Sequence, residues 1–88
     1  MKWHVDFSKD SLKFLKKNNF EETFVLEKIT LAIKKFSGED ININIKKMTG
    51  DWAGFYRIRD GKIRIIVEFQ FDIYRAYIED IDWRGNIY

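Results

Sequence analysis

The sequence predicts an α+β fold in which an N-terminal strand and a two-helix hairpin pack on an antiparallel sheet, in the order β-α-α-β-β-β. Apolar residues recur at helical spacing in the first part of the chain and alternate with polar residues from residue 41 onward. An Asp-Gly pair at positions 60 and 61 joins two alternating runs, which is the strongest local signal for a β-hairpin. Residues 1–88 are expected to form a single domain.

The first part of the chain predicts one strand and two helices. Residues 2–8, KWHVDFS, alternate apolar and polar side chains, as a half-buried strand does. Ser8 can cap a short basic helix that ends near Asn18. Asn19 followed by Glu22 resembles a capping box, which would start a second helix. The expected core stripe of that helix is Val25, Ile29, Ala32 and Phe36, widened by Leu26 and Ile33.

The remainder of the chain predicts the rest of the sheet. Gly38 ends the second helix, and the alternating isoleucines of residues 41–48 form a candidate further strand. The segment TGDWAG, residues 49–54, holds two glycines and interrupts or bulges the chain. The hairpin follows, its second strand running to about Phe69. Residues 73–83 form a last strand whose alternation is imperfect.

Positive charge gathers on one face of the hairpin YRIRDGKIRI. With the Asp-Gly pair as the turn, the apolar side chains share one face and the basic side chains share the other. The basic face comprises Arg57, Arg59, Lys62 and Arg64, with Arg59 opposite Lys62 and Arg57 opposite Arg64. Like charges that face each other in a ladder destabilise it by a few tenths to about 1 kcal/mol per pair. We therefore expect a negatively charged ligand on that face.

Composition limits the kind of site that the chain can carry. Hydrophobic residues make up 45% of the chain and aromatic residues 17%, which suits a compact core. The absence of cysteine excludes disulfides, thiol nucleophiles and thiolate metal sites. No apolar run reaches the roughly 18 residues of a membrane span, and no leader is present, so we expect a soluble cytoplasmic protein without a membrane partner.

The charged residues are unevenly distributed along a chain whose net charge is only +2. Residues 44–64 hold six basic and two acidic side chains, whereas residues 65–88 hold five acidic and two basic side chains. A local basic patch on a nearly neutral protein predicts a bounded anionic site and not a surface for long nucleic acid. The acidic final strand lacks metal-ligand spacing, so no metal site and no cofactor are expected.

The element order, the segments KKMTG and YRIRDGKIR, and the terminal Arg84-x-x-x-Tyr88 together resemble the RelE/ParE superfamily of toxins from type II toxin–antitoxin systems. The resemblance covers essentially the whole chain. It implies a small toxin that is neutralised by a cognate antitoxin. RelE-like members cleave mRNA in the ribosomal A site, so it further implies a ribosome-dependent endoribonuclease that inhibits translation and needs no metal.

The resemblance also implies a set of site residues. The catalytic candidates are Arg57, Arg59, Arg64, Arg84 and Tyr88, and the RNA-binding candidates are Lys46, Lys47 and Lys62. Two positions depart from the family pattern: Trp83 stands where many relatives carry histidine, and arginine fills both basic positions of the first hairpin strand. Glu68 is a conceivable general base, whereas His4 is expected to be an ordinary exposed residue.

The sequence leaves several alternatives open. The chain could be a ParE-like inhibitor of DNA gyrase that acts by protein–protein contact, or a degenerate toxin that only binds its antitoxin. The hairpin arginines could form a solvated face that is neutralised by Glu79, Asp80 or Asp82. Trp52 and Trp83 could be packing aromatics or platforms for nucleotide bases.

Overall fold

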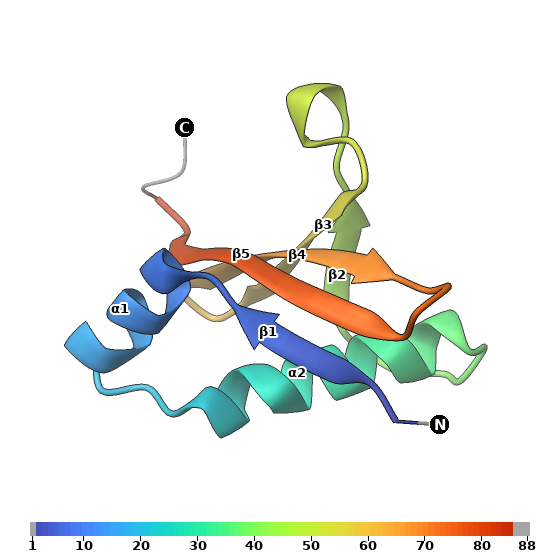
Figure 1. The fold of residues 1–88 in the computed structure, drawn as a ribbon, viewed down its shortest axis with the longest axis horizontal. Coiled ribbons are helices and arrows are strands. Elements are labelled where there is room, and N and C mark those ends of the chain that lie inside the picture. Colours follow the sequence, from blue (N-terminus) through green and yellow to red (C-terminus); the bar gives the residue numbers. More distant parts are fainter. Residues whose placement is uncertain (1, 86–88) are drawn as a thin grey trace.

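The computed structural model describes residues 2–85 and has two layers, a sheet and a pair of helices (Figure 1). The strands are β1 (His4–Phe7), β2 (Asn44–Lys47), β3 (Phe55–Asp60), β4 (Ile63–Gln70) and β5 (Arg75–Trp83), and they form one five-stranded sheet in the order β1-β5-β4-β3-β2. The helices α1 (Lys9–Lys17) and α2 (Glu22–Phe36) pack on one face. The opposite face, called the open face below, carries no α-helix among the described residues.

The structure confirms the α+β prediction and the further strand, which forms as β2. The sheet is mixed, however, because β1 pairs in parallel with β5, while the other strand pairs are antiparallel. The two helices carry the chain beneath the sheet from the β1 edge to the β2 edge, so the last strand returns to lie beside the first (Figure 1). An alternating pattern shows which face a side chain takes but not which strand lies next to it.

The core lies between α2 and the three central strands. Val25 and Ile29 of α2 meet Ile58, Ile65 and Ile78 of the sheet, and all five side chains are at most 1% exposed. The predicted stripe of α2 is therefore correct at its centre. Its last member, Phe36, is 38% exposed, because it packs at the margin of the core against Tyr56 and Phe69.

Ser8 caps α1, as predicted, and also ties that helix to the sheet. Its side-chain oxygen accepts a hydrogen bond from the amide of Ser11 at 3.1 Å, and its hydroxyl donates to the carbonyl of Glu79 in β5 at 2.8 Å. Such a cap stabilises a helix by about 1 kcal/mol.

The predicted capping box at Asn19 is wrong. Asn19 has a φ of 59°, and it ends α1 instead of starting α2. The amide of Phe20 donates to the carbonyl of Leu15 at 2.9 Å, and the amide of Asn19 donates to the carbonyl of Lys16 at 3.4 Å. These are the two hydrogen bonds of a Schellman motif, in which asparagine replaces the usual glycine. The N-cap of α2 is Glu21, which makes no side-chain capping bond.

We expect Asn19→Ala to lower the free energy of unfolding by about 1 kcal/mol, because alanine adopts the left-handed conformation less readily than asparagine does. Asn19→Gly should match or exceed the wild-type stability. Urea unfolding followed by circular dichroism measures both variants. Equal losses in the two variants would show that the asparagine side chain, and not its backbone conformation, matters.

The turn of the central hairpin differs from the prediction by one residue. Gly61 and Lys62 form the two-residue loop, so Asp60 pairs with Ile63 and Arg59 pairs with Arg64. Gly61 has a φ of 60° and Lys62 has no positive φ, which is the pattern of a type II′ turn. The new pairing shifts the register by two residues, an even number, so the predicted basic and apolar faces survive. Lys62 leaves the basic face and lies in the turn.

A β-bulge explains the imperfect alternation of the last strand. Ile66 pairs with Asp80 and Val67 pairs with Ile78, so Glu79 is an extra residue in β5. Because the bulge reverses the alternation, Ile78 and Ile81 both face the core, at 0% and 2% exposure. Asp80 and Asp82 consequently lie on the open face.

Candidate nucleic-acid interface

Basic side chains from three adjacent strands come together on the open face. The pairing of β2, β3 and β4 arranges the residues of this face in rows across the sheet. One row is Asn44, Arg59, Arg64 and Asp82, and the next is Lys46, Arg57, Ile66 and Asp80. Each row therefore runs from a basic side to an acidic side. The structure thus brings together the hairpin arginines and Lys46 from the predicted site.

Arg59 has a buried hydrogen-bond donor that a ligand could satisfy. Its side chain is half-buried, and its buried Nε atom has no hydrogen-bond partner among the described residues. Within residues 2–85 the ion pairs are Lys28–Asp60 and Asp6–Arg75, neither of which involves Arg59. A buried donor without a partner costs about 1–3 kcal/mol. An anion on the open face would satisfy this guanidinium, which favours a binding site over a self-neutralised surface.

Arg64 lies deeper than the other two hairpin arginines. It is 1% exposed, and it lies between Arg59 on β3 and Asp82 on β5 in the same row. An arginine keeps its charge at every physiological pH, even when it is buried. Arg64 therefore adds positive potential beneath the surface, whereas Arg57 and Arg59 are partly exposed and accessible to a ligand.

Arg84 joins the site from the end of the last strand. Its amide donates to the carbonyl of Lys62 at 2.7 Å, and its Nη1 donates to the carbonyl of Gly61 at 3.0 Å. These two bonds fix Arg84 against the hairpin turn. A cavity of about 610 Å³ results, lined by Arg59, Gly61, Lys62, Trp83, Arg84 and Gly85. Lys62 therefore lines the cavity from its position in the turn, although it does not lie on the basic face of the strands.

Trp83 packs against the helical layer, as one of its two predicted roles requires. Its ring packs edge-on against Phe14 at 5.3 Å and lies 6.2 Å from Phe20, which anchors it to the helical layer. It also lines the cavity beside Arg84. An indole has no titratable proton near neutral pH, so Trp83 cannot act as a general acid or base.

Of the other residues that the sequence singled out, Lys47 and His4 lie outside the rows of this cluster. Lys47 pairs with Tyr56, in the register position that faces the helices, and it borders the cluster by lining a second cavity together with Lys46 and Arg57. His4 lies on β1, at the opposite edge of the sheet from β2. Tyr88 lies outside the described residues. Among residues 2–85, no group of three or more histidine, aspartate and glutamate side chains could hold a metal ion.

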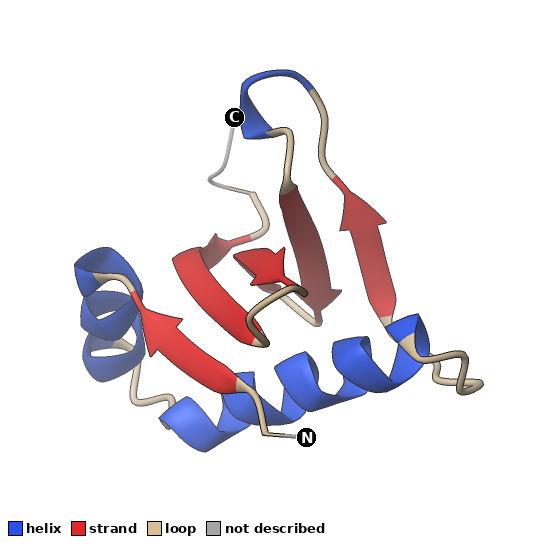
Figure 2. Ribbon diagram, turned by 45° about the vertical axis from the view of Figure 1, so that its right-hand side comes forward, coloured by secondary structure: helices blue, strands red, loops and turns tan. Residues whose placement is uncertain are grey.

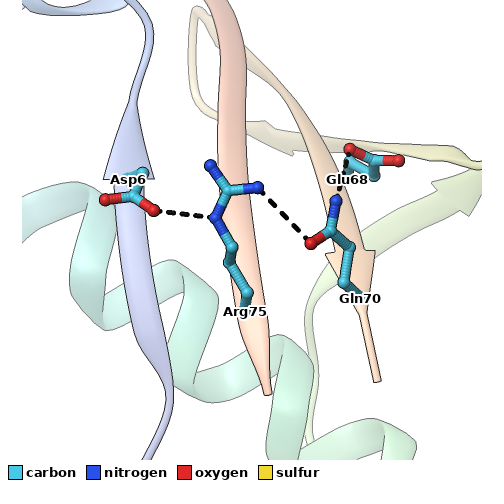
Figure 3. A network of polar contacts seen from close by, with 4 residues as sticks. All are labelled: Asp6, Glu68, Gln70 and Arg75. Atoms are coloured by element: carbon cyan, nitrogen blue, oxygen red, sulfur yellow. Dashed lines mark hydrogen bonds and ion pairs between the residues drawn. The ribbon is translucent and has the colours of Figure 1, made fainter. Parts of the chain in front are cut away.

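Glu68 is committed to a polar network at the other end of the open face (Figure 3). Gln70 donates to Glu68 at 3.2 Å and accepts from Arg75 at 3.4 Å, and Arg75 in turn pairs with Asp6 at 2.8 Å. Four residues along β4 separate Glu68 from Arg64, or about 13 Å. Glu68 is therefore a poorer candidate for a general base than the sequence indicates.

Asp80 is the functional candidate that sequence reasoning considered only as a neutralising charge. Its carboxyl is half-buried on the open face, and burial raises its pKa, as does repulsion from Asp82. The backbone amide of Ile81 and the charge of Arg64 act in the opposite direction. A carboxyl with a raised pKa is a better proton acceptor than an ordinary one. The imperfect alternation of the last strand was its only signal in the sequence.

We expect Asp80→Asn to stabilise the protein at pH 7. A carboxyl with a raised pKa binds its proton more tightly in the folded state, so its ionised form opposes folding above that pKa. The cost is absent below the unfolded value of about 3.8, where both states are protonated. Urea midpoints should therefore be higher for the variant at pH 7 and should converge with wild type at pH 3. An equal gain at both pH values would show that the ionised carboxylate is not the source of the cost.

No helix within residues 2–85 is long and apolar enough to cross a membrane.

No family model matches the chain, and no curated protein matches it. Several solved structures share its fold.

These structures include complexes of toxins with antitoxins. One chain of the YoeB–YefM toxin–antitoxin complex from Staphylococcus aureus superposes with a TM-score of 0.63 at 16% identity, covering 96% of this chain and 99% of that one. The toxin–antitoxin complex RelBE2 from Mycobacterium tuberculosis gives 0.61 at 19%, covering 96% and 100%. The archaeal RelE–RelB complex from Pyrococcus horikoshii gives 0.61 at 22%, covering 99% and 100%. The chain therefore has the fold of the RelE-type toxins, as its sequence pattern predicted.

Proposed function

We propose that this protein is the toxin of a type II toxin–antitoxin module and that it cleaves mRNA on the ribosome, which inhibits translation. The observation that carries the proposal is Arg59, whose buried Nε has no hydrogen-bond partner within residues 2–85 and which pairs with Arg64 and lines the Arg84 cavity. The RelE-type fold supports the same function. Since ribosomes and their messages are cytoplasmic, the proposal places the protein there.

The arginines would supply the charge that cleavage needs. The ribose 2′-hydroxyl gives up its proton to a base, and its oxygen forms a bond to the adjacent phosphorus. The bond from phosphorus to the 5′-oxygen of the next nucleotide breaks, and that oxygen takes up a proton from water. The products are a 2′,3′-cyclic phosphate and a 5′-hydroxyl. Arg57 and Arg59 are exposed enough to bind the phosphate oxygens, and Arg64 adds charge from below. Positive charge placed in advance at the developing phosphorane removes the need for a metal ion.

Asp80 is our candidate for the proton acceptor. It lies in the same row as Arg57, with Ile66 between them. Strands lie about 4.8 Å apart, so Arg57 and Asp80 are about 10 Å apart across the sheet at the backbone. A phosphate held by Arg57 can then bring its attached ribose toward Asp80. A well-placed general base accelerates such a reaction by about 100- to 10 000-fold.

The proposed protein partner is a cognate antitoxin. The chain shares its fold with chains of toxin–antitoxin complexes. It also exposes large apolar side chains at one end of the molecule, where Phe71 is 46%, Ile73 58% and Tyr74 38% exposed. Apolar side chains gathered on a small protein are typical of a surface that binds another protein.

The test is the integrity of mRNA in a purified translation system, with and without ribosomes, mapped by primer extension. We expect cuts at codons in the ribosomal A site, and only when ribosomes are present. An intact message would contradict the nuclease proposal. DNA gyrase supercoiling is the next assay in that case, because inhibition there would indicate a ParE-like activity by protein contact.

A further inference from the structure

A second basic cavity lies where β2 and β3 meet the segment that connects them, residues 48–54, called the β2–β3 arm below. Its volume is about 410 Å³, and it is lined by Lys46, Lys47, Met48, Thr49, Trp52 and Arg57. It shares no lining residue with the cavity at Arg84. The arm carries the short 3-10 helix η1 (Gly50–Trp52) to the side of the sheet away from α2 (Figure 2).

The backbone around η1 holds Trp52 in a defined position. Gly50 has a φ of 67°, a left-handed conformation that a glycine adopts without strain. The amide of Ala53 donates to the carbonyl of Gly50 at 3.1 Å. The amide of Met48 donates to the carbonyl of Phe55 at 2.9 Å. These bonds close the turn at both its centre and its base.

The Trp52 side chain is half-buried and lines this cavity. Its neighbour Phe55 lies perpendicular to it, at an interplanar angle of 88° and a centroid distance of 5.5 Å. A perpendicular contact covers at most one face of the indole. The described structure therefore presents a fixed aromatic surface, which is the arrangement that proteins use to stack nucleic-acid bases.

The cations of this cavity suit a phosphate. Lys46 and Arg57 are directly paired across β2 and β3, so two positive charges face each other at a cost of a few tenths to about 1 kcal/mol. Both side chains can donate charge-assisted hydrogen bonds to the oxygens of a phosphate. Asp51 is the one acidic residue of η1, and it is exposed and not part of the cavity lining.

The spacing along β3 connects this cavity with the cluster around Arg59. Two residues along a strand span about 7 Å, which is comparable to the distance between neighbouring phosphates of an extended single strand. Arg57 and Arg59 lie two residues apart on the open face, and each borders a different cavity.

We propose that the Trp52 cavity binds one nucleotide of single-stranded RNA next to the site of cleavage. The base stacks on Trp52, and its phosphate lies between Lys46 and Arg57, while Arg59 holds the following phosphate. This inference rests on the proposed function, because it extends the RNA path of that same open face. It assigns Trp52 a role in gripping and positioning RNA, and not in the chemical step.

Binding of a fluorescein-labelled RNA hexamer, followed by anisotropy without ribosomes, tests the inference. Base stacking on an aromatic side chain contributes about 1–3 kcal/mol per base, so Trp52→Ala should weaken binding by about 5- to 150-fold. Trp52→Phe keeps an aromatic ring and should lose much less. Trp3→Phe is the matched control, because Trp3 packs against Phe69, Phe71 and Tyr74, away from η1, and should bind as wild type does.

Tryptophan emission gives a second readout that does not depend on the alanine variant folding. Unlabelled hexamer should quench the emission of the double variant Trp3→Phe/Trp83→Phe, whose only tryptophan is Trp52. Absence of quenching in that variant while it still binds RNA, or unchanged affinity in a folded Trp52→Ala, would overturn the inference.

The two proposals fail in different ways. Stacking on Trp52 with an intact message in the translation assay would reject the nuclease proposal and leave the RNA-binding cavity in place. Ribosome-dependent cuts together with unaltered hexamer affinity in Trp52→Ala would reject the Trp52 cavity alone.

Discussion

Replacing Arg59 with glutamine is expected to slow the cleavage of ribosome-bound mRNA by about 100- to 1000-fold. Glutamine keeps a polar side chain but removes the charge that would stabilise the phosphorane. It also removes a buried Nε atom that has no hydrogen-bond partner, so the fold should tolerate the change. Primer extension at a fixed time after toxin addition, over a range of protein concentrations, measures the rate.

Arg75→Gln is the matched control for that variant. Arg75 lies on the same open face but pairs with Asp6 at 2.8 Å, at the opposite edge of the sheet (Figure 3). Exposed ion pairs of this kind contribute little to stability, so the variant should remain folded and active. Equal losses of activity in Arg59→Gln and Arg75→Gln would indicate a general effect of charge on ribosome association and would contradict a specific role for Arg59.

Charge reversal at Arg64 is expected to destabilise the fold by about 3–5 kcal/mol. The side chain is 1% exposed, so glutamate at this position would place a carboxylate in the interior. Asp82 pairs with position 64, and Asp80 lies in the next row, so repulsion would add to the cost of desolvation. Urea unfolding and the yield of folded protein measure the effect. A stable Arg64→Glu variant would show that position 64 is more hydrated than its burial indicates.

Arg64→Met separates the role of Arg64 in the fold from its role in the site. Methionine fills a similar volume without charge, so it places no carboxylate beside Asp82 and should cost less stability than Arg64→Glu. We expect a folded protein that cleaves mRNA at least about 100-fold more slowly than wild type. Full activity in this variant would remove Arg64 from the catalytic assignment, whereas Arg64→Glu alone could not do so.

The sequence by itself determined the two-layer fold and the basic face. The helical stripe at Val25 and Ile29 and the alternation of the hairpin each report directly which side of an element is buried. The basic face survived even the error in the turn. A shift of two residues returns every side chain to its original face, so Arg57, Arg59 and Arg64 stayed together.

Only the tertiary structure decided which strands are neighbours and which charges meet. The parallel pairing of β1 with β5 depends on the path of the two helices beneath the sheet, and no local pattern encodes that path. The bulge at Glu79 turns Asp80 onto the open face, opposite to what plain alternation predicts. Asn19 shows the same limit at short range, because its left-handed backbone, and not its side chain, ends α1.

The depth of the site residues also came from the structure alone. Arg57, Arg59 and Arg64 are equivalent in the sequence pattern, yet Arg64 is almost fully buried and the other two are partly exposed. Periodicity assigns a side chain to a face, but exposure on that face depends on what the neighbouring strands place beside it. The face on which the hairpin arginines gather could therefore be predicted from the amino-acid sequence, whereas their depth and their neighbours required the packing of distant segments against one another.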